Sequence, residues 1–219
     1  FSPPIAVIND FNFLGTLDDR DWRSGMSEAV KVALIKDATF FYWLEDHALG
    51  LSRRDTETME KLIFDCAVLH VDHISSQGDP FEMGSSRPLD FGHWAAHKLE
   101  QLTEFEMKHG EAVAIGLVLD LAYAVSEGLL AHNVFERVYA VLGQLGFTLF
   151  HPLLLNQETN ALNPEVYAGL EEFRAHLGGQ LTITLIKEIG IQFNVHEMNK
   201  NSLDRAALLL HQKSIIHAN

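Results

Sequence analysis

The sequence has little of what defines several classes of protein. It holds one cysteine, Cys66, so an internal disulfide framework like that of small secreted proteins is excluded. Its 16 Lys and Arg residues stand against 30 Asp and Glu residues, which leaves a formal net charge of -14. A nucleic-acid partner is therefore not expected, because neutralising phosphates requires clustered cations. A small anionic ligand would need only a few cations placed locally.

Long hydrophobic runs and targeting signals are also missing. The sequence does not open with a charged stretch followed by an apolar one, as a secretory signal does. The longest apolar run, residues 112–125, is shorter than the roughly 20 residues that a membrane span needs, and it contains Asp120. The run predicts a buried core helix. We therefore expect a cytoplasmic protein with no membrane partner.

Apolar residues are plentiful enough for one sizeable core, since 47% of the 219 residues are hydrophobic. Helical spacing of these residues and polar residues suited to helix ends predict a series of helices. The helices are expected at 18–37, 38–49, 54–76, from near 91, 110–126, 133–145, 164–177 and 202–215. Alternating residues between glycines at 178–198 predict a small strand pair. The fold class is therefore mainly α, in one compact domain.

The opening residues suggest that a domain is missing. "IAVIN" reads as a short buried strand, and the sequence offers no strand upstream for it to pair with. We expect residues 1–16 to be a remnant of, or linker from, an N-terminal domain. Residues 17–219 would then form the helical domain.

Three short segments carry candidate chemistry. "SEAVK" places Glu28 and Lys31 on one helix face, and "GHWAAH" does the same for His93 and His97. "KHGEAVAIG" places His109 at the start of the long apolar helix. A carboxylate and two imidazoles can hold Zn²⁺ with positions left open for water or substrate. Spacing alone leaves ordinary surface or core histidines as the other interpretation, since the chain has 12 histidines.

The segments "DRDWRSGMSEAVKVALIKDATFFYWLE", "LDFGHWAAHKLE" and "KHGEAVAIGLV" resemble three successive motifs of the 3-dehydroquinate synthase family, in order and in separation. The resemblance implies that Glu28, His93 and His109 bind a catalytic Zn²⁺ or Co²⁺. It also implies that Lys31 contacts the substrate and that His97 transfers protons.

The same resemblance implies an architecture and a reaction. Family members have an N-terminal NAD-binding α/β domain, a helical metal-binding domain and usually a homodimeric assembly, so this chain would be the second domain without the first. The implied reaction uses NAD and the metal to convert a phosphorylated C7 keto sugar into a carbocycle with elimination of phosphate. Because the chain lacks a G-x-G-x-x-G fingerprint, we expect most NAD-binding residues in the missing domain and no activity from the chain alone.

Departures from the family pattern concern the substrate. Asp90 stands where the family usually has Asn, and Cys66 stands where it carries a substrate-binding Lys. Arg87 is displaced by one residue from the position of the family's Arg. The paired lysines near the C-terminus of family members have no clear counterpart in this chain, where Arg174 is the nearest cation. Asp90, Arg87 and Arg174 are our candidate substrate-binding residues. Exchanging a cation for a thiol and an amide for a carboxylate disfavours a carboxylated substrate, so the pattern indicates a divergent cyclase whose substrate stays open.

Two other functions compete with this one. A polyol or glycerol dehydrogenase of the same superfamily would stop at oxidation, although those enzymes typically have Asp where Glu28 stands. A helical assembly module that has lost catalysis is the second alternative, and it would bind no metal.

Overall fold

The computed structural model describes residues 5–76 and 88–217. The α-helices in this part of the chain are α1 (Asp19–Lys36), α2 (Ala38–Ser52), α3 (Thr56–Ser76), α4 (His93–Leu102), α5 (His109–Ser126), α6 (His132–Gln144), α7 (Pro164–His176) and α8 (Lys200–His217). The shorter elements are the 3-10 turns η1 (Phe11–Thr16), η2 (Pro88–Asp90) and η3 (Pro152–Leu154) and the strands β1 (Leu155–Asn156), β2 (Ala161–Leu162), β3 (Ile183–Glu188) and β4 (Ile191–Val195). The predicted fold class, mainly α with a small strand pair, is confirmed.

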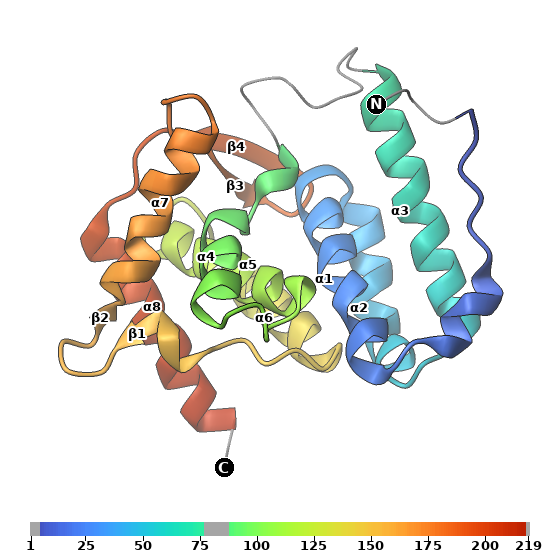
Figure 1. Ribbon diagram of the computed structural model, residues 1–219, viewed down its shortest axis with the longest axis horizontal. Helices are drawn as coiled ribbons and strands as arrows, with labels where there is room; N and C mark the ends of the chain where they lie inside the picture. The colour runs from blue at the N-terminus through green and yellow to red at the C-terminus, as the bar shows by residue number, and fades with distance from the viewer. Residues whose placement is uncertain (1–4, 77–87, 218–219) are drawn as a thin grey trace.

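Helix α5 lies at the centre of the fold, with α1 on one side and α4 and α8 on others (Figure 1). It is long and apolar enough to span a membrane by length and composition, yet more than three quarters of its residues are buried inside the protein. A helix that is apolar on all sides is expected to be packed on all sides. The predicted core helix is confirmed, and its first residue lies where α1 and α4 approach it.

The helix boundaries follow from local capping. The Asp18 carboxylate accepts the Asp21 N–H at the start of α1, and the Asp37 carboxylate does the same for the first turn of α2. Asn163 caps α7, whose first residue is Pro164. Such side chains satisfy N–H groups that a helix start leaves unpaired. The predicted boundaries therefore agree with the structure to within a few residues.

Two antiparallel strand pairs complete the described part of the fold. β3 and β4 form the expected hairpin, and the N–H of Gly190 in its turn donates to the Leu34 carbonyl, which docks the hairpin on α1. The pair β1–β2 was missed, because "NQETNALNPE" reads as a polar linker. Leu155 and Leu162 pair across it and are both buried. The two apolar residues are too few to show an alternating pattern.

The predicted strand in the opening residues is wrong. Residues 5–9 have no strand, and the side chains of Ile5, Val7 and Ile8 lie exposed. Leu14 and Leu17, which follow, pack against the core. The assignment of residues 1–16 to a neighbouring domain stays a prediction.

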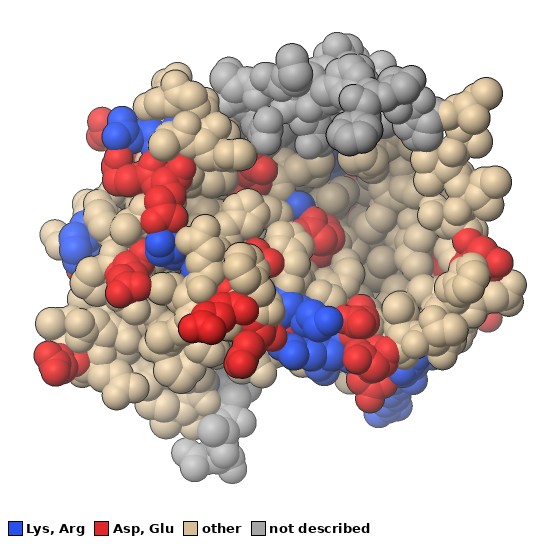
Figure 2. All heavy atoms as spheres, viewed as in Figure 1, with Lys and Arg blue, Asp and Glu red and all other residues tan. Residues whose placement is uncertain are grey.

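Acidic side chains are spread over the face seen in Figure 2, where basic side chains are fewer and partly gathered near its centre. The same face is hollowed beside α1, between that helix and α3. This hollow leads to Glu28, the first residue of the candidate site.

Candidate metal centre

The three motifs meet where α1, α4 and α5 pack together. Glu28 comes from the middle of α1, His93 is the first residue of α4 and His109 is the first residue of α5. Glu28 Oε1 lies 3.5 Å from His93 Nε2 and 3.3 Å from His109 Nε2. The ligand atoms of the three residues lie within 4.8 Å of one another. Positions up to 81 residues apart therefore converge as the motifs predicted.

Each of the two histidines is held by its other ring nitrogen. His93 Nδ1 lies 3.0 Å from the Phe91 carbonyl oxygen, and His109 Nδ1 lies 3.2 Å from Glu100 Oε2. Both oxygens can only accept from a ring N–H, so this geometry assigns the proton to Nδ1 in each ring. Nε2 then presents a lone pair toward Glu28. Metal-binding histidines commonly have this arrangement, in which an outer acceptor fixes the tautomer and the ring orientation.

The Glu28 oxygen that faces these two lone pairs accepts no hydrogen bond within the part of the chain that the structure describes. Among the described residues no group hydrogen-bonds to its buried Oε1 atom, whereas Oε2 pairs with Lys31 Nζ at 2.5 Å. An unpaired buried carboxylate oxygen is costly. Three acceptors that face one another fit a cation, and one carboxylate with two imidazoles is a ligand set that suits Zn²⁺. The residues present therefore fit a divalent metal ion.

Titration of the cluster favours a negatively charged Glu28. Burial by itself would raise the pKa of Glu28, but its contacts with His109, His93 and Lys31 outweigh burial and hold that pKa far below its usual range. The contact with Glu28 raises the pKa of His109, burial opposes this and Glu100 adds to it. A proton and a metal ion compete for the Nε2 lone pair of His109, so metal binding should strengthen as pH rises.

The two predicted catalytic residues lie at the same place. Lys31 is almost fully buried, and its ammonium group contacts Glu28. The His97 ring lies one helical turn along α4, with its centroid 5.4 Å from that of His93 and 6.1 Å from that of His109. Partial burial and the neighbouring His93 lower the pKa of His97. Glu28, His93 and His109 are called the metal group below. A neutral, exposed imidazole beside them can accept a proton near pH 7.

The candidate substrate-binding residues have separate outcomes. Asp90 ends η2, is half-buried and lies close enough to His97 to oppose the lowering of that pKa. Arg87 lies outside the described residues. Arg174 lies on the exposed side of α7, where its guanidinium pairs with Glu171.

A cavity of about 270 Å³ lies beside His97, between α4 and α7. Lys98 and His176 line that cavity, together with other residues of α4 and α7, and Arg174 does not. Lys98 pairs with Glu172 at 2.5 Å. Lys98 directly follows His97 in sequence and is therefore a cation on the wall of this cavity that sequence analysis did not single out.

A second cavity, of about 320 Å³, opens between α1 and α3 beside Glu28. Its walls are almost entirely apolar, with Leu62, Ile63 and Cys66 contributed by α3. Burial raises the pKa of the Cys66 thiol to about 12, and Asp65 and Glu28 add to this. The position where the family pattern has a cation is therefore a neutral thiol beside an apolar cavity.

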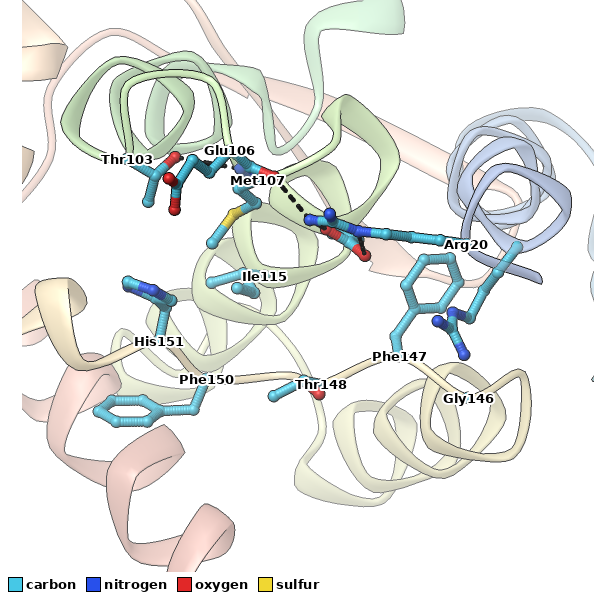
Figure 3. Close-up of a pocket in the computed structure, with 12 residues that line it drawn as sticks. Arg20, Thr103, Glu106, Met107, Ile115, Gly146, Phe147, Thr148, Phe150 and His151 are labelled. Atoms are coloured by element: carbon cyan, nitrogen blue, oxygen red, sulfur yellow. Dashed lines mark hydrogen bonds and ion pairs between the residues drawn. The ribbon is translucent and has the colours of Figure 1, made fainter. Parts of the chain in front are cut away.

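Another cavity, of about 630 Å³, contains none of the three residues Glu28, His93 and His109. It is lined by Arg20, Met107, Phe147 and His151, among others (Figure 3). Arg20 donates two hydrogen bonds to the Glu111 carboxylate, which also accepts the backbone N–H of the residue before α5. Glu111 thus secures the start of α5 and does not belong to the group of Glu28, His93 and His109.

Sequence reasoning missed the residues that hold the histidines. The Phe91 carbonyl carries no sequence signal, because it belongs to the backbone. Glu100 did carry one, since it follows His93 by seven residues and His97 by three and therefore shares their face of α4. Asp120 also carried a sequence signal, because it is the one charged residue in the longest apolar run.

Comparison with known proteins places these residues in a family context. The family described as 3-dehydroquinate synthase C-terminal matches residues 25–165, which include Glu28, His93 and His109. The 3-dehydroquinate synthase of Halorhodospira halophila is 32% identical over 191 residues, which is 87% of this chain and 51% of that protein. The 2-epi-valiolone synthase of Actinosynnema mirum is 32% identical over 212 residues, 95% of this chain and 53% of that protein.

Solved structures agree. The 2-epi-5-epi-valiolone synthase of Streptomyces hygroscopicus subsp. jinggangensis 5008, solved with NAD⁺ and Zn²⁺ bound, superposes with a TM-score of 0.82 at 29% identity, covering 93% of this chain and 55% of that one. A 2-deoxy-scyllo-inosose synthase, with a TM-score of 0.67 at 19% identity, covers 91% of this chain and 55% of that one and shares the fold. The chain thus spans about half the length of the relatives it matches.

Proposed function

The chain belongs to the 3-dehydroquinate synthase-like family of sugar phosphate cyclases and matches the C-terminal domain of that family. We therefore propose that it is the metal-binding catalytic domain of an NAD-dependent and metal-dependent cyclase. The reaction would convert a phosphorylated C7 keto sugar into a carbocycle and eliminate phosphate, as a carbon–oxygen lyase. The observation that carries this proposal is the convergence of Glu28 Oε1, His93 Nε2 and His109 Nε2.

Glu28, His93 and His109 would hold Zn²⁺ or Co²⁺ and leave coordination positions open. When bound, the metal would supply Lewis acidity to a substrate hydroxyl or carbonyl oxygen. The chain's own contribution is orientation. Phe91 and Glu100 hold the two rings, and Lys31 holds the other oxygen of Glu28, so the ligands need little rearrangement when the metal binds.

Lys31 and His97 would have different roles toward the substrate, Lys31 as a fixed positive charge and His97 as a group that transfers protons. The buried ammonium group of Lys31 cannot move far from Glu28, so it presents a fixed positive charge at the floor of the site. His97 is exposed and neutral near pH 7, and its free ring nitrogen can take a proton from a substrate hydroxyl or return one. NAD would be bound mainly by the remainder of the full-length protein, since this chain spans about half of its relatives.

The surroundings of the metal group favour a substrate without a carboxylate. The Cys66 thiol is neutral, the cavity between α1 and α3 is apolar, and Asp90 adds negative charge near His97. A carboxylate placed in the cavity beside Cys66 would lose its hydration without gaining a cation from the position where the family has a lysine. The chain is equally identical to a 3-dehydroquinate synthase and to a 2-epi-valiolone synthase. Sequence identity therefore does not distinguish a carboxylated substrate from one without a carboxylate, and the proposal rests on the local chemistry.

Phosphate release by the full-length protein tests the proposal. With NAD⁺ and Zn²⁺ supplied, sedoheptulose 7-phosphate should release phosphate faster than the carboxylated heptulosonate phosphate. A preference for the carboxylated substrate would contradict the substrate assignment alone. Oxidation of polyols without phosphate release from either sugar would instead favour a dehydrogenase. A homodimeric assembly and a cytoplasmic location stay predictions.

A further inference from the structure

One buried carboxylate brackets the proposed metal ligand on α4. Asp120, in the middle of α5, is fully buried. Its Oδ2 atom accepts the Gly92 backbone N–H at 3.0 Å, and its Oδ1 atom accepts the Trp94 indole N–H at 2.8 Å. These two donors belong to the residues immediately before and after His93. A single side chain on α5 therefore fixes the backbone on one side of His93 and a side chain on the other.

The two helices touch at this point through their backbones. Gly92 has a φ of +78°, and a side chain there would place its Cβ 2.8 Å from the Leu117 nitrogen. A Cβ on Gly116 would lie 1.9 Å from the Gly92 carbonyl oxygen. Contacts this close leave room for glycine alone. The start of α4 is thus seated directly on α5, one turn of that helix before Asp120.

The ring of His93 is anchored to the same short stretch. Its Nδ1 atom bonds to the carbonyl of Phe91, which itself is fully buried. The ring orientation therefore depends on where residues 91–94 lie, and Asp120 holds two of those four residues. Displacement of this stretch would move His93 Nε2 relative to Glu28 and His109.

Stability alone gives a poor account of Asp120. The surrounding faces of α4 and α5 are apolar, and the carboxylate meets two neutral donors there. Burial raises the pKa of Asp120 to about 7, which shows that this environment disfavours its charge. A buried acid of this kind is commonly no more stabilising than an apolar side chain of similar size. What the acid supplies is direction, since its two oxygens bind two donors at fixed positions.

We propose that Asp120 is a positioning residue for the metal site, which sets the place and orientation of His93 through Gly92 and Trp94. This inference rests on the proposed function, in which His93 is a metal ligand. It predicts that changes at Asp120 or Trp94 alter metal binding although neither residue belongs to the ligand group.

The test compares D120N and W94F with Y123F in the full chain. Tyr123 is the matched control, because it is buried on the same helix and its hydroxyl accepts the Asn199 N–H just before α8, not a donor that flanks His93. Zn²⁺ affinity is measured by competition with a chelator, and the visible absorption spectrum of the Co²⁺-loaded protein reports ligand geometry. D120N should weaken Zn²⁺ binding by about 10- to 100-fold, the usual range for loss of a group that orients a ligand. W94F should weaken it less, and both should change the Co²⁺ spectrum.

Y123F should lower the melting temperature and leave the Zn²⁺ affinity and Co²⁺ spectrum as they are. If D120N lowers only the melting temperature, or if Y123F weakens metal binding as much, the positioning role is refuted. Should D120N fail to fold, W94F decides, because it keeps the carboxylate and its bond to Gly92. An unchanged Co²⁺ spectrum in W94F would then refute the role. If the unaltered protein binds no Zn²⁺ that H93A removes, the proposed function itself fails.

Discussion

At the scale of single residues, the two oxygens of Glu28 have different environments. Oε2 pairs with a buried ammonium group, and Oε1 faces two imidazole nitrogens without a donor among the described residues. The carboxylate can therefore bind a metal through one oxygen while the other stays neutralised. This separation depends on Lys31, which lies three residues further along the same face of α1.

Replacing either proposed histidine ligand should remove the metal. We expect about one Zn²⁺ per chain in the unaltered protein and much less in H93A or H109A, because two remaining ligands hold zinc weakly. H132A is the control, since His132 pairs with Glu136 at the start of α6 and is exposed. Elemental analysis after dialysis measures the content. Full occupancy in both ligand variants would refute the site.

Asp120 should give the protein a pH-dependent stability near neutrality. Its pKa in the folded state, about 7, lies above the usual 3.8, so the folded state holds a proton that the unfolded state has lost. The associated stability is complete below the unfolded pKa and disappears as pH rises through 7. Between pH 5.5 and pH 8 the free energy of unfolding should fall by about 2 kcal/mol more than in D120N. Urea titrations of both proteins in chelator measure this, and parallel pH profiles would contradict it.

At the scale of helices, the position of His93 depends on the close crossing of α4 on α5. Gly116 is the residue that allows it, because the Gly92 carbonyl occupies the space of a side chain. Glycine inside a helix is otherwise unfavourable. The crossing therefore takes precedence over helix propensity at this position.

G116A should destabilise the protein although alanine is the better helix former. The added Cβ overlaps backbone atoms, which cannot rotate away, so we expect a loss of about 3 kcal/mol or more in the free energy of unfolding. G143A is the matched variant, because nothing lies within 4 Å of its added Cβ on α6. It should stabilise the protein by about 0.5 to 1 kcal/mol. Urea denaturation compares the two, and equal effects would show that the crossing tolerates a side chain.

The elements that could be predicted from sequence are those determined locally. Helix starts at Asp18, Asp37 and Asn163 follow from side chains that cap the adjacent turn. The strand expected in residues 5–9 failed because a strand needs a partner, which an apolar pattern does not specify. The pair Leu155 and Leu162 was missed for the converse reason, since its two-residue strands have a partner but no pattern.

The candidate site was predictable in its residues and not in its supports. The resemblance of three motifs to the 3-dehydroquinate synthase family implied Glu28, His93 and His109 as metal ligands, and the structure brings these three residues together. That Asp120 contacts both neighbours of His93 depends on how α5 crosses α4, which no local pattern encodes. Arg174 was chosen for its charge alone, and because it lies exposed on α7 and pairs with Glu171, its substrate-binding role stays a prediction.

At the scale of the whole molecule, the metal group links three helices that are distant in sequence. Each proposed ligand comes from a different helix, and both α1 and α4 pack against the central helix α5. A metal bound by all three would therefore oppose global unfolding, since the unfolded chain has no preformed site.

Chelation should lower the melting temperature of the protein. With free Zn²⁺ at 100 times its dissociation constant, binding stabilises the folded state by about 2.7 kcal/mol, and a chelator removes this. The effect should grow with Zn²⁺ concentration and vanish in H93A, which serves as the control. Calorimetric scans at several Zn²⁺ concentrations measure it. A melting temperature that does not depend on Zn²⁺ would contradict a site shared by the three helices.

The pairing of Lys31 with Glu28 has a further consequence for how substrate arrives. This chain is strongly negative, and at long range its charge would repel the proposed phosphorylated substrate. Inside the site, however, the only carboxylate ligand is already balanced by an ammonium group, so a divalent ion would keep its full double charge. Close to the metal group, the field of a bound divalent ion would therefore oppose that of the whole chain. At physiological ionic strength, with a screening length of about 8 Å, the distant repulsion is damped while this local attraction is kept. Moderate salt should thus speed the capture of an anionic substrate, where most charged sites are slowed by it.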